Sequence, residues 1–151
     1  MLTRRATLGL LALAPAGFAL APRPASARAT EVFQNPIAIN ATDPVAYFTQ
    51  HATVAGSADH AVMWNGAEWH FSSADNAATF TANPAAYAPV FGGYCAYAAS
   101  LGYIANTVPE AWTVYEGKLY LNANLRAREL WLRDVPGNIA LGLGNWPGIL
   151  G

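Results

Sequence analysis

Residues 60–71 constrain the fold more than any other part of this sequence. Asn65-Gly66 lies between two segments in which large apolar residues recur at alternate positions, and this dipeptide is the favoured two-residue turn of an antiparallel hairpin. A two-residue turn fixes the register, so Met63 faces Glu68 across the hairpin. One face must then point into a core, and it carries His60, Val62, Trp64, Ala67, Trp69 and Phe71.

The opposite face of this hairpin gathers Met63, Glu68 and His70. Thioether, carboxylate and imidazole groups can together hold a metal ion, so this patch is a candidate ligand set. The alternative is an ordinary solvated sheet face with no ligand role. His60, at the strand end, is a further candidate ligand, and a hydrogen-bonded histidine at the rim of the core is its alternative.

A second hairpin is expected over residues 112–121, with Glu116-Gly117 at its turn. Short helical stretches are expected around it, each opened by a capping residue or closed by Pro or Gly. They cover residues 43–48, 72–83, 84–87, 94–100, 125–133 and 139–143. The pattern predicts an α+β fold, in which a small antiparallel sheet from two β-hairpins is covered by short helices.

Cys95 is the only cysteine among the 151 residues. It follows Gly92-Gly93 and opens an alanine-rich stretch, where the positive end of a helix would favour its thiolate. The glycines would allow a ligand or another backbone segment to approach closely. Two alternatives remain, because the glycines can simply form a tight turn and a free cysteine is often buried and inert.

Residues 1–29 have the pattern of a cleaved export signal. Arg4 and Arg5 precede an apolar run over 8–21 that is too short to remain as a membrane span. Small residues predict cleavage after Ala29 or after Ala27. The arginine pair resembles a twin-arginine signal, and the general export route is the alternative. We therefore expect a periplasmic protein that is not integral to the membrane, with residues 30–151 forming one domain.

The charge of residues 30–151 narrows the choice of partners. This part has four Lys and Arg against nine Asp and Glu, which leaves a net charge of −5. No Lys or Arg occurs between Arg28 and Lys118. A surface of this sign repels phosphate backbones, so nucleic acid is excluded as a partner. No phosphate loop, catalytic serine triad, zinc-hydrolase motif or dinucleotide fingerprint is present, so an enzyme is not the first expectation.

Several of these motifs together resemble the YHS domain, a small metal-associated module. The first part of the resemblance covers about residues 37–87 and rests on Asp43-Pro44-Val45, Trp69-His70-Phe71-Ser72-Ser73, Phe80 and Asn83-Pro84-Ala85-Ala86-Tyr87. It extends to one branch, the exported bacterial YHS-domain (seleno)proteins, whose C-terminal extension is similar to Gly92–Ala98, Pro109–Thr113, Gly117–Asn122, Asp134–Gly137 and Asn145–Pro147.

The departures from the family pattern bear on its implied metal site. Metal-binding YHS domains carry three cysteines at positions that here hold Ala46, Ser72 and either Asp75 or Asn76. The resemblance therefore implies no thiolate set in this chain. It does imply a chemical role for Cys95, which matches the position where relatives carry selenocysteine.

Three hypotheses follow. The first is a soft-metal module for copper or a similar ion, in which Cys95 is assisted by His70, Met63 or His60. The second is a thiol redox protein, in which Cys95 pairs with a thiol of a partner protein or of a second copy. The third is a structural or small-ligand-binding module with Cys95 buried as filler. We expect the first, and convergence of the four candidate ligands in space would favour it.

Overall fold

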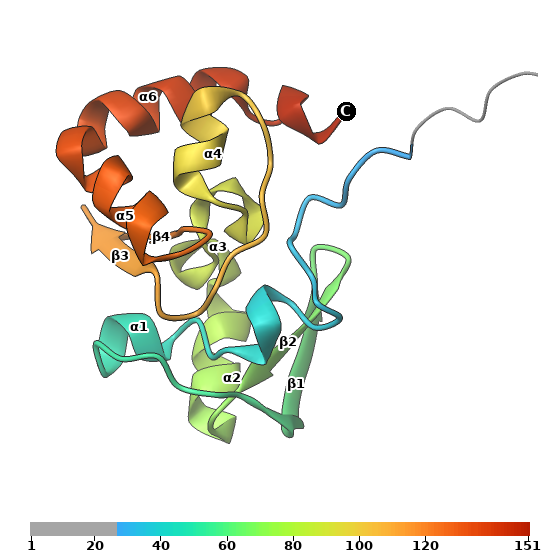
Figure 1. Cartoon of the computed structure of the whole chain (residues 1–151). Helices are drawn as coiled ribbons and strands as arrows, with labels where there is room; N and C mark the ends of the chain where they lie inside the picture. The colour runs from blue at the N-terminus through green and yellow to red at the C-terminus, as the bar shows by residue number, and fades with distance from the viewer. Residues whose placement is uncertain (1–26) are drawn as a thin grey trace, which may run out of the picture.

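The computed structural model describes residues 27–151 (Figure 1), and its architecture is α+β, as the sequence predicts. Four strands form two hairpins: β1 (Ser57–Trp64) with β2 (Ala67–Phe71), and β3 (Trp112–Tyr115) with β4 (Lys118–Leu121). Six α-helices are described: α1 (Ala46–Thr49), α2 (Ala74–Ala82), α3 (Pro84–Tyr87), α4 (Ala96–Leu101), α5 (Leu125–Trp131) and α6 (Val135–Asn145). Four 3-10 turns join them: η1 (Ile39–Ala41), η2 (Val90–Gly93), η3 (Leu132–Asp134) and η4 (Gly148–Leu150).

Both hairpins have the predicted register. Met63 pairs with Glu68 in the first hairpin, and Val114 pairs with Leu119 in the second. Both residues of the first turn have positive φ, 49° at Asn65 and 74° at Gly66, as a two-residue hairpin turn requires.

The hairpins form two separate two-stranded sheets rather than one shared sheet. The free edge of each hairpin is occupied by another part of the chain. The Ala38 amide donates to the Glu68 carbonyl beside β2, and Cys95 bridges to Leu121 beside β4. These contacts satisfy edge groups that a shared sheet would have used.

Two large hydrophobic clusters and a small third one, of Phe33, Tyr94 and Leu150, make up the interior of the described residues. The first lies between the β1–β2 hairpin, α2 and one face of the second hairpin; its buried members include Tyr47, Trp69, Phe71, Phe80, Leu119 and Leu121. The second lies on the other side of β4, against the C-terminal helices, and contains Phe91, Ala96, Ala99, Tyr120 and Trp131. Leu119 and Tyr120 thus point into different clusters, and the second hairpin is covered on both faces. Tyr120 is buried although it lies on the face opposite Leu119, because Trp131 of α5 covers that face.

The first described residues are fixed against the C-terminus. The Ala29 amide donates to the Leu150 carbonyl at 2.8 Å, and the Tyr94 hydroxyl donates to the Thr30 carbonyl at 3.0 Å. Cleavage after Ala27 would keep the first hydrogen bond, and cleavage after Ala29 would remove it. The rest of the predicted export signal lies outside the described residues. Within residues 27–151, no helix is both long enough and apolar enough to cross a membrane.

Candidate functional site

Cys95 is the N-cap residue of α4. Its backbone is extended (φ −60°, ψ 118°), and the helix begins at the next residue. The Ala98 amide donates a hydrogen bond to the Cys95 sulfur at 3.4 Å, in the manner of a serine or aspartate cap. The sequence predicts Cys95 within the first turn of a helix. In the structure Cys95 directly precedes the first helical residue, because Gly92 and Gly93 form the separate turn η2.

Asn122 holds the Cys95 thiol from the other side. The thiol donates to Asn122 Oδ1 at 3.5 Å, and the Tyr97 amide donates to the same oxygen at 3.0 Å. The Asn122 side chain is fully buried, and its Nδ2 has no hydrogen-bond partner among the described residues. Two contacts, one from Ala98 and one from Asn122, therefore fix the orientation of the sulfur.

Cys95 lies in the wall of a hollow of about 270 Å³ between α4, the following loop and α5. Its lining includes Cys95, Tyr97, Tyr103, Asn124, Arg126 and Leu130, and we call it the thiol hollow. Only 2% of Cys95 is exposed. Cys95 is thus one of the residues that line the hollow, although almost none of its surface is exposed.

Arg126 gives the thiol hollow its charged group. It lines the hollow and also donates to Glu129 at 2.8 Å on the helix surface. The hydrogen bond and charge of Arg126 hold the pKa of the Glu129 carboxyl below its ordinary value. Because the pair is exposed, water screens it.

The other three candidate ligands lie on the first hairpin. Met63 and Glu68 are paired across β1 and β2, and His70 Nε2 contacts Glu68 Oε1 at 2.7 Å, so the predicted patch exists. Met63 is 69% exposed, and His60 is half-buried. His70 is buried rather than solvated, because Gly56 runs against its backbone so closely that a Cβ there would overlap it.

The structure does not bring these three residues to Cys95. Figure 1 shows α4 and the β1–β2 hairpin well apart in the molecule. Across residues 27–151, no three His, Cys, Asp or Glu side chains gather closely enough to hold a metal ion. The patch on the hairpin and the thiol hollow are therefore separate places, and metal binding stays a prediction.

Ala46, Ser72 and Asn76, which stand where the YHS pattern has cysteines, come together at Asp43. This buried carboxylate accepts from the Ala46 amide at 3.3 Å, from the Ser72 hydroxyl at 2.7 Å and from Asn76 Nδ2 at 2.7 Å. It also accepts the amides of Val45 and Ser72. In this chain the location is a closed hydrogen-bond cluster that joins α1, β2 and α2.

Two neighbours of Cys95 were not predicted from the sequence. Asn122 is directed to Cys95, whereas Asn124 caps α5, and Arg126 lines the same hollow. The available signal was a polar residue directly after the apolar Leu121, since polar groups that become buried need partners. No family model, curated protein or solved structure gives a match to this chain.

Proposed function

We propose that this protein is a thiol–disulfide exchange module that carries small thiols on Cys95. One observation carries the proposal: the Cys95 sulfur is oriented by Ala98 and Asn122 in the wall of a small-molecule-sized hollow with a cationic rim. The Ala98 amide donates to the Cys95 sulfur, and the thiolate is the nucleophilic form of a cysteine. The hydrogen bond to Asn122 holds the protonated thiol in the same place.

The reaction is an exchange between Cys95 and a disulfide of two small thiols. The Cys95 thiolate attacks one sulfur, a new disulfide forms with that half, and the other half leaves as a thiolate that takes up a proton. Cys95 is oxidised and the departing thiol is reduced. A second small thiol reverses the step and regenerates Cys95. No second cysteine exists in this chain, so the resolving thiol must come from outside.

The thiol hollow suits small anionic disulfides. Its volume of about 270 Å³ is near the lower end of ordinary ligand pockets. Arg126 offers a guanidinium that pairs with carboxylates. The same charge disfavours a metal cation, and no second soft side chain lines the hollow. For these reasons we favour the thiol–disulfide exchange hypothesis over the copper-binding hypothesis.

The test compares the folded chain with the urea-unfolded chain. Dithiodipyridine, a neutral disulfide, releases a coloured thione when a thiol attacks it, and intact mass counts the adduct. We expect the folded protein to gain one adduct at a rate that does not depend on unfolding, to keep its circular dichroism spectrum, and to be regenerated by glutathione. The Cys95→Ser variant is the blank.

Two outcomes would contradict the proposed exchange function. If the folded protein reacts only as fast as it unfolds, Cys95 is buried filler and the exchange function fails. If copper(I) binds stoichiometrically against a competing chelator and Cys95→Ser abolishes that binding, the metal hypothesis replaces the exchange hypothesis. The matched pair Met63→Leu and His70→Gln would then show whether the hairpin patch contributes.

A further inference from the structure

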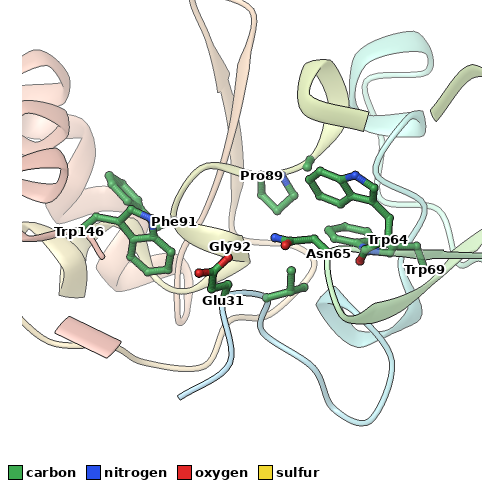
Figure 2. Close-up of a pocket in the computed structure, with 10 residues that line it drawn as sticks. Glu31, Trp64, Asn65, Trp69, Pro89, Phe91, Gly92 and Trp146 are labelled. Atoms are coloured by element: carbon green, nitrogen blue, oxygen red, sulfur yellow. The ribbon is translucent and has the colours of Figure 1, made fainter. Parts of the chain in front are cut away.

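A second hollow, of about 220 Å³, lies where the two hydrophobic clusters meet (Figure 2). We call it the aromatic hollow, and its lining includes Glu31, Trp64, Asn65, Trp69, Phe91 and Trp146. Figure 2 shows Trp146 and Phe91 on one side of it, Trp64 and Trp69 on the other, and Glu31 below. It shares no lining residue with the thiol hollow.

The aromatic walls are fixed by packing. Trp64 and Trp69 stand 5.8 Å apart between ring centroids, and Phe91 and Trp146 stand 5.9 Å apart. The first pair belongs to the first cluster and the second pair to the second cluster. The two walls are therefore anchored in different parts of the core. Trp69 and Phe91 are themselves buried, so the partly exposed Trp64 and Trp146 are the rings that a ligand could contact.

Glu31 is held at the hollow by a close backbone contact. The Phe33 amide donates to the Gly92 carbonyl at 2.9 Å, and a Cβ at Gly92 would overlap the Glu31 carbonyl oxygen. Gly92 also has a positive φ of 62°, which glycine adopts without strain. Gly92 therefore allows a second backbone segment to approach closely. The sequence left open whether the glycines admit a ligand or another backbone segment.

Of residues 27–151, Glu31 is the one charged side chain that lines this hollow. Glu31 is exposed and makes no salt bridge within the described residues. The lining contains no Lys or Arg, and none occurs in the sequence between Arg28 and Lys118. A carboxylate beside several aromatic rings attracts a cation, because the ring faces are also electronegative.

We propose that the aromatic hollow binds a small quaternary ammonium ion, with Glu31 balancing its charge. Apart from Glu31 and Asn65, the side chains that line the hollow are apolar or aromatic and offer an N–H donor no acceptor. A methylated ammonium has no N–H to satisfy, and its methyl groups suit aromatic walls. The volume admits a headgroup-sized ion rather than a drug-sized ligand. This inference does not depend on the proposed function of Cys95.

Choline and tetramethylammonium are the probes, and calorimetry with NMR titration of the whole protein is the measurement. Glu31→Gln should weaken choline binding by about fivefold, the usual size of a partly exposed charge contact. Asp59→Asn removes the same charge from an exposed position on β1 that does not line the hollow, and it should leave binding unchanged.

The ligand series tests the chemistry independently of any variant. The neutral carbon isostere of choline has the same shape without the charge, and it should bind at least about fivefold more weakly. Equal binding of the isostere, or an unchanged affinity in Glu31→Gln, would overturn cation recognition. Tighter binding of ethanolamine than of choline would overturn the quaternary assignment, and no binding of choline would end the proposal.

Trp146 provides the test of the aromatic wall. Trp146→Phe keeps a ring against Phe91 and should retain most of the affinity, whereas Trp146→Leu should reduce it by about fivefold or more. Unfolding transitions of both variants show whether they are folded under the binding conditions. If the folded leucine variant binds choline like the wild type, the aromatic wall is not a recognition element.

Discussion

The two hollows of this domain have opposite chemistry. The thiol hollow holds a nucleophile, Cys95, and a cation, Arg126. The aromatic hollow holds a carboxylate, Glu31, among aromatic rings, and none of its lining side chains is a thiol, hydroxyl or amine. The first fits the proposed covalent exchange with anions, and the second fits the proposed reversible binding of cations. If both proposals hold, one small fold separates two ligand classes by charge.

The hollows also differ in how the chain builds them. The thiol hollow comes from two short stretches, residues 95–105 and 123–130. The aromatic hollow needs four, around residues 31–32, 64–69, 88–92 and 146. A site assembled from more segments depends more on the whole tertiary fold. Changes that loosen the contacts between segments should affect the aromatic hollow first.

The largest effect is expected from Gly92→Ala. The new Cβ would overlap backbone at Glu31 and would also occupy a left-handed conformation. Overpacking and backbone strain together predict a loss of about 3 kcal/mol in the free energy of unfolding. Urea unfolding followed by tryptophan fluorescence measures it.

Gly66→Ala is the matched control for the strain alone. Gly66 has a similar φ of 74°, but a Cβ there would meet nothing within 4 Å. We expect a loss of about 1 kcal/mol. Equal losses in the two variants would mean that the contact between Gly92 and Glu31 is not tight, and the placement of Glu31 at the aromatic hollow would lose its support.

Asp43→Ala should cost somewhat less than Gly92→Ala. The substitution leaves the Ser72 and Asn76 donors without their buried acceptor, for a predicted loss of about 2–3 kcal/mol. Asp43 supports the part of the molecule that supplies Trp64 and Trp69. In the folded variant, choline affinity should therefore fall while the exchange rate of Cys95 stays the same. A parallel fall in both would show that the two hollows are coupled.

The hairpins could be predicted because their information is local. Asn65-Gly66 and Glu116-Gly117 each specify a two-residue turn, and such a turn determines the cross-strand pairs next to it. Farther from the first turn the register shifts, and Phe71 pairs with Ser57. How the hairpins meet is not local. Whether Leu121 pairs with another strand or with Cys95 depends on contacts between distant segments, and the sequence does not show them.

The candidate site, too, could be predicted only where its information is local. A single cysteine after two glycines indicated Cys95 in advance, and the helix after it followed from its alanines. Asn122 is 27 positions away in the sequence, and only the packing of β4 against α4 brings it to the thiol. The aromatic hollow could not be predicted for the same reason. The sequence shows many aromatic residues, but not which of them line one hollow.

Tyr47→Phe tests how much the buried tyrosine of the first cluster contributes to the loss of stability at alkaline pH. Burial raises the pKa of Tyr47 well above the ordinary tyrosine value of about 10. Above that pH the unfolded chain releases the Tyr47 proton and the folded chain keeps it, so stability falls as pH rises, by up to about 1.4 kcal/mol per pH unit. The phenylalanine variant removes this term and should lose less stability between about pH 9 and about pH 11.

Tyr120→Phe is the counterpart in the second cluster. Burial also raises the pKa of Tyr120, with Glu116 adding to the effect. Tyr47 has the larger shift, so the wild-type alkaline loss should be relieved more by Tyr47→Phe than by Tyr120→Phe. Melting temperatures at the two pH values test this order. The reverse order would mean that the second cluster, not the first, excludes water better.

The smallest effect tests the charge of the thiol hollow. Arg126 and Arg133 both contact Glu129, and of the two only Arg126 lines the hollow. Arg126→Gln should slow the reaction of Cys95 with an anionic disulfide, such as dithiobis-nitrobenzoate, by about threefold at low salt. Arg133→Gln should leave that rate unchanged, and neither variant should alter the rate with neutral dithiodipyridine. The difference between the variants should disappear in high salt, because screening removes the attraction.

If both variants slow both reagents equally, Glu129 or the helix surface is responsible. The thiol hollow would then have no preference for anions, and its contrast with the aromatic hollow would rest on Cys95 alone.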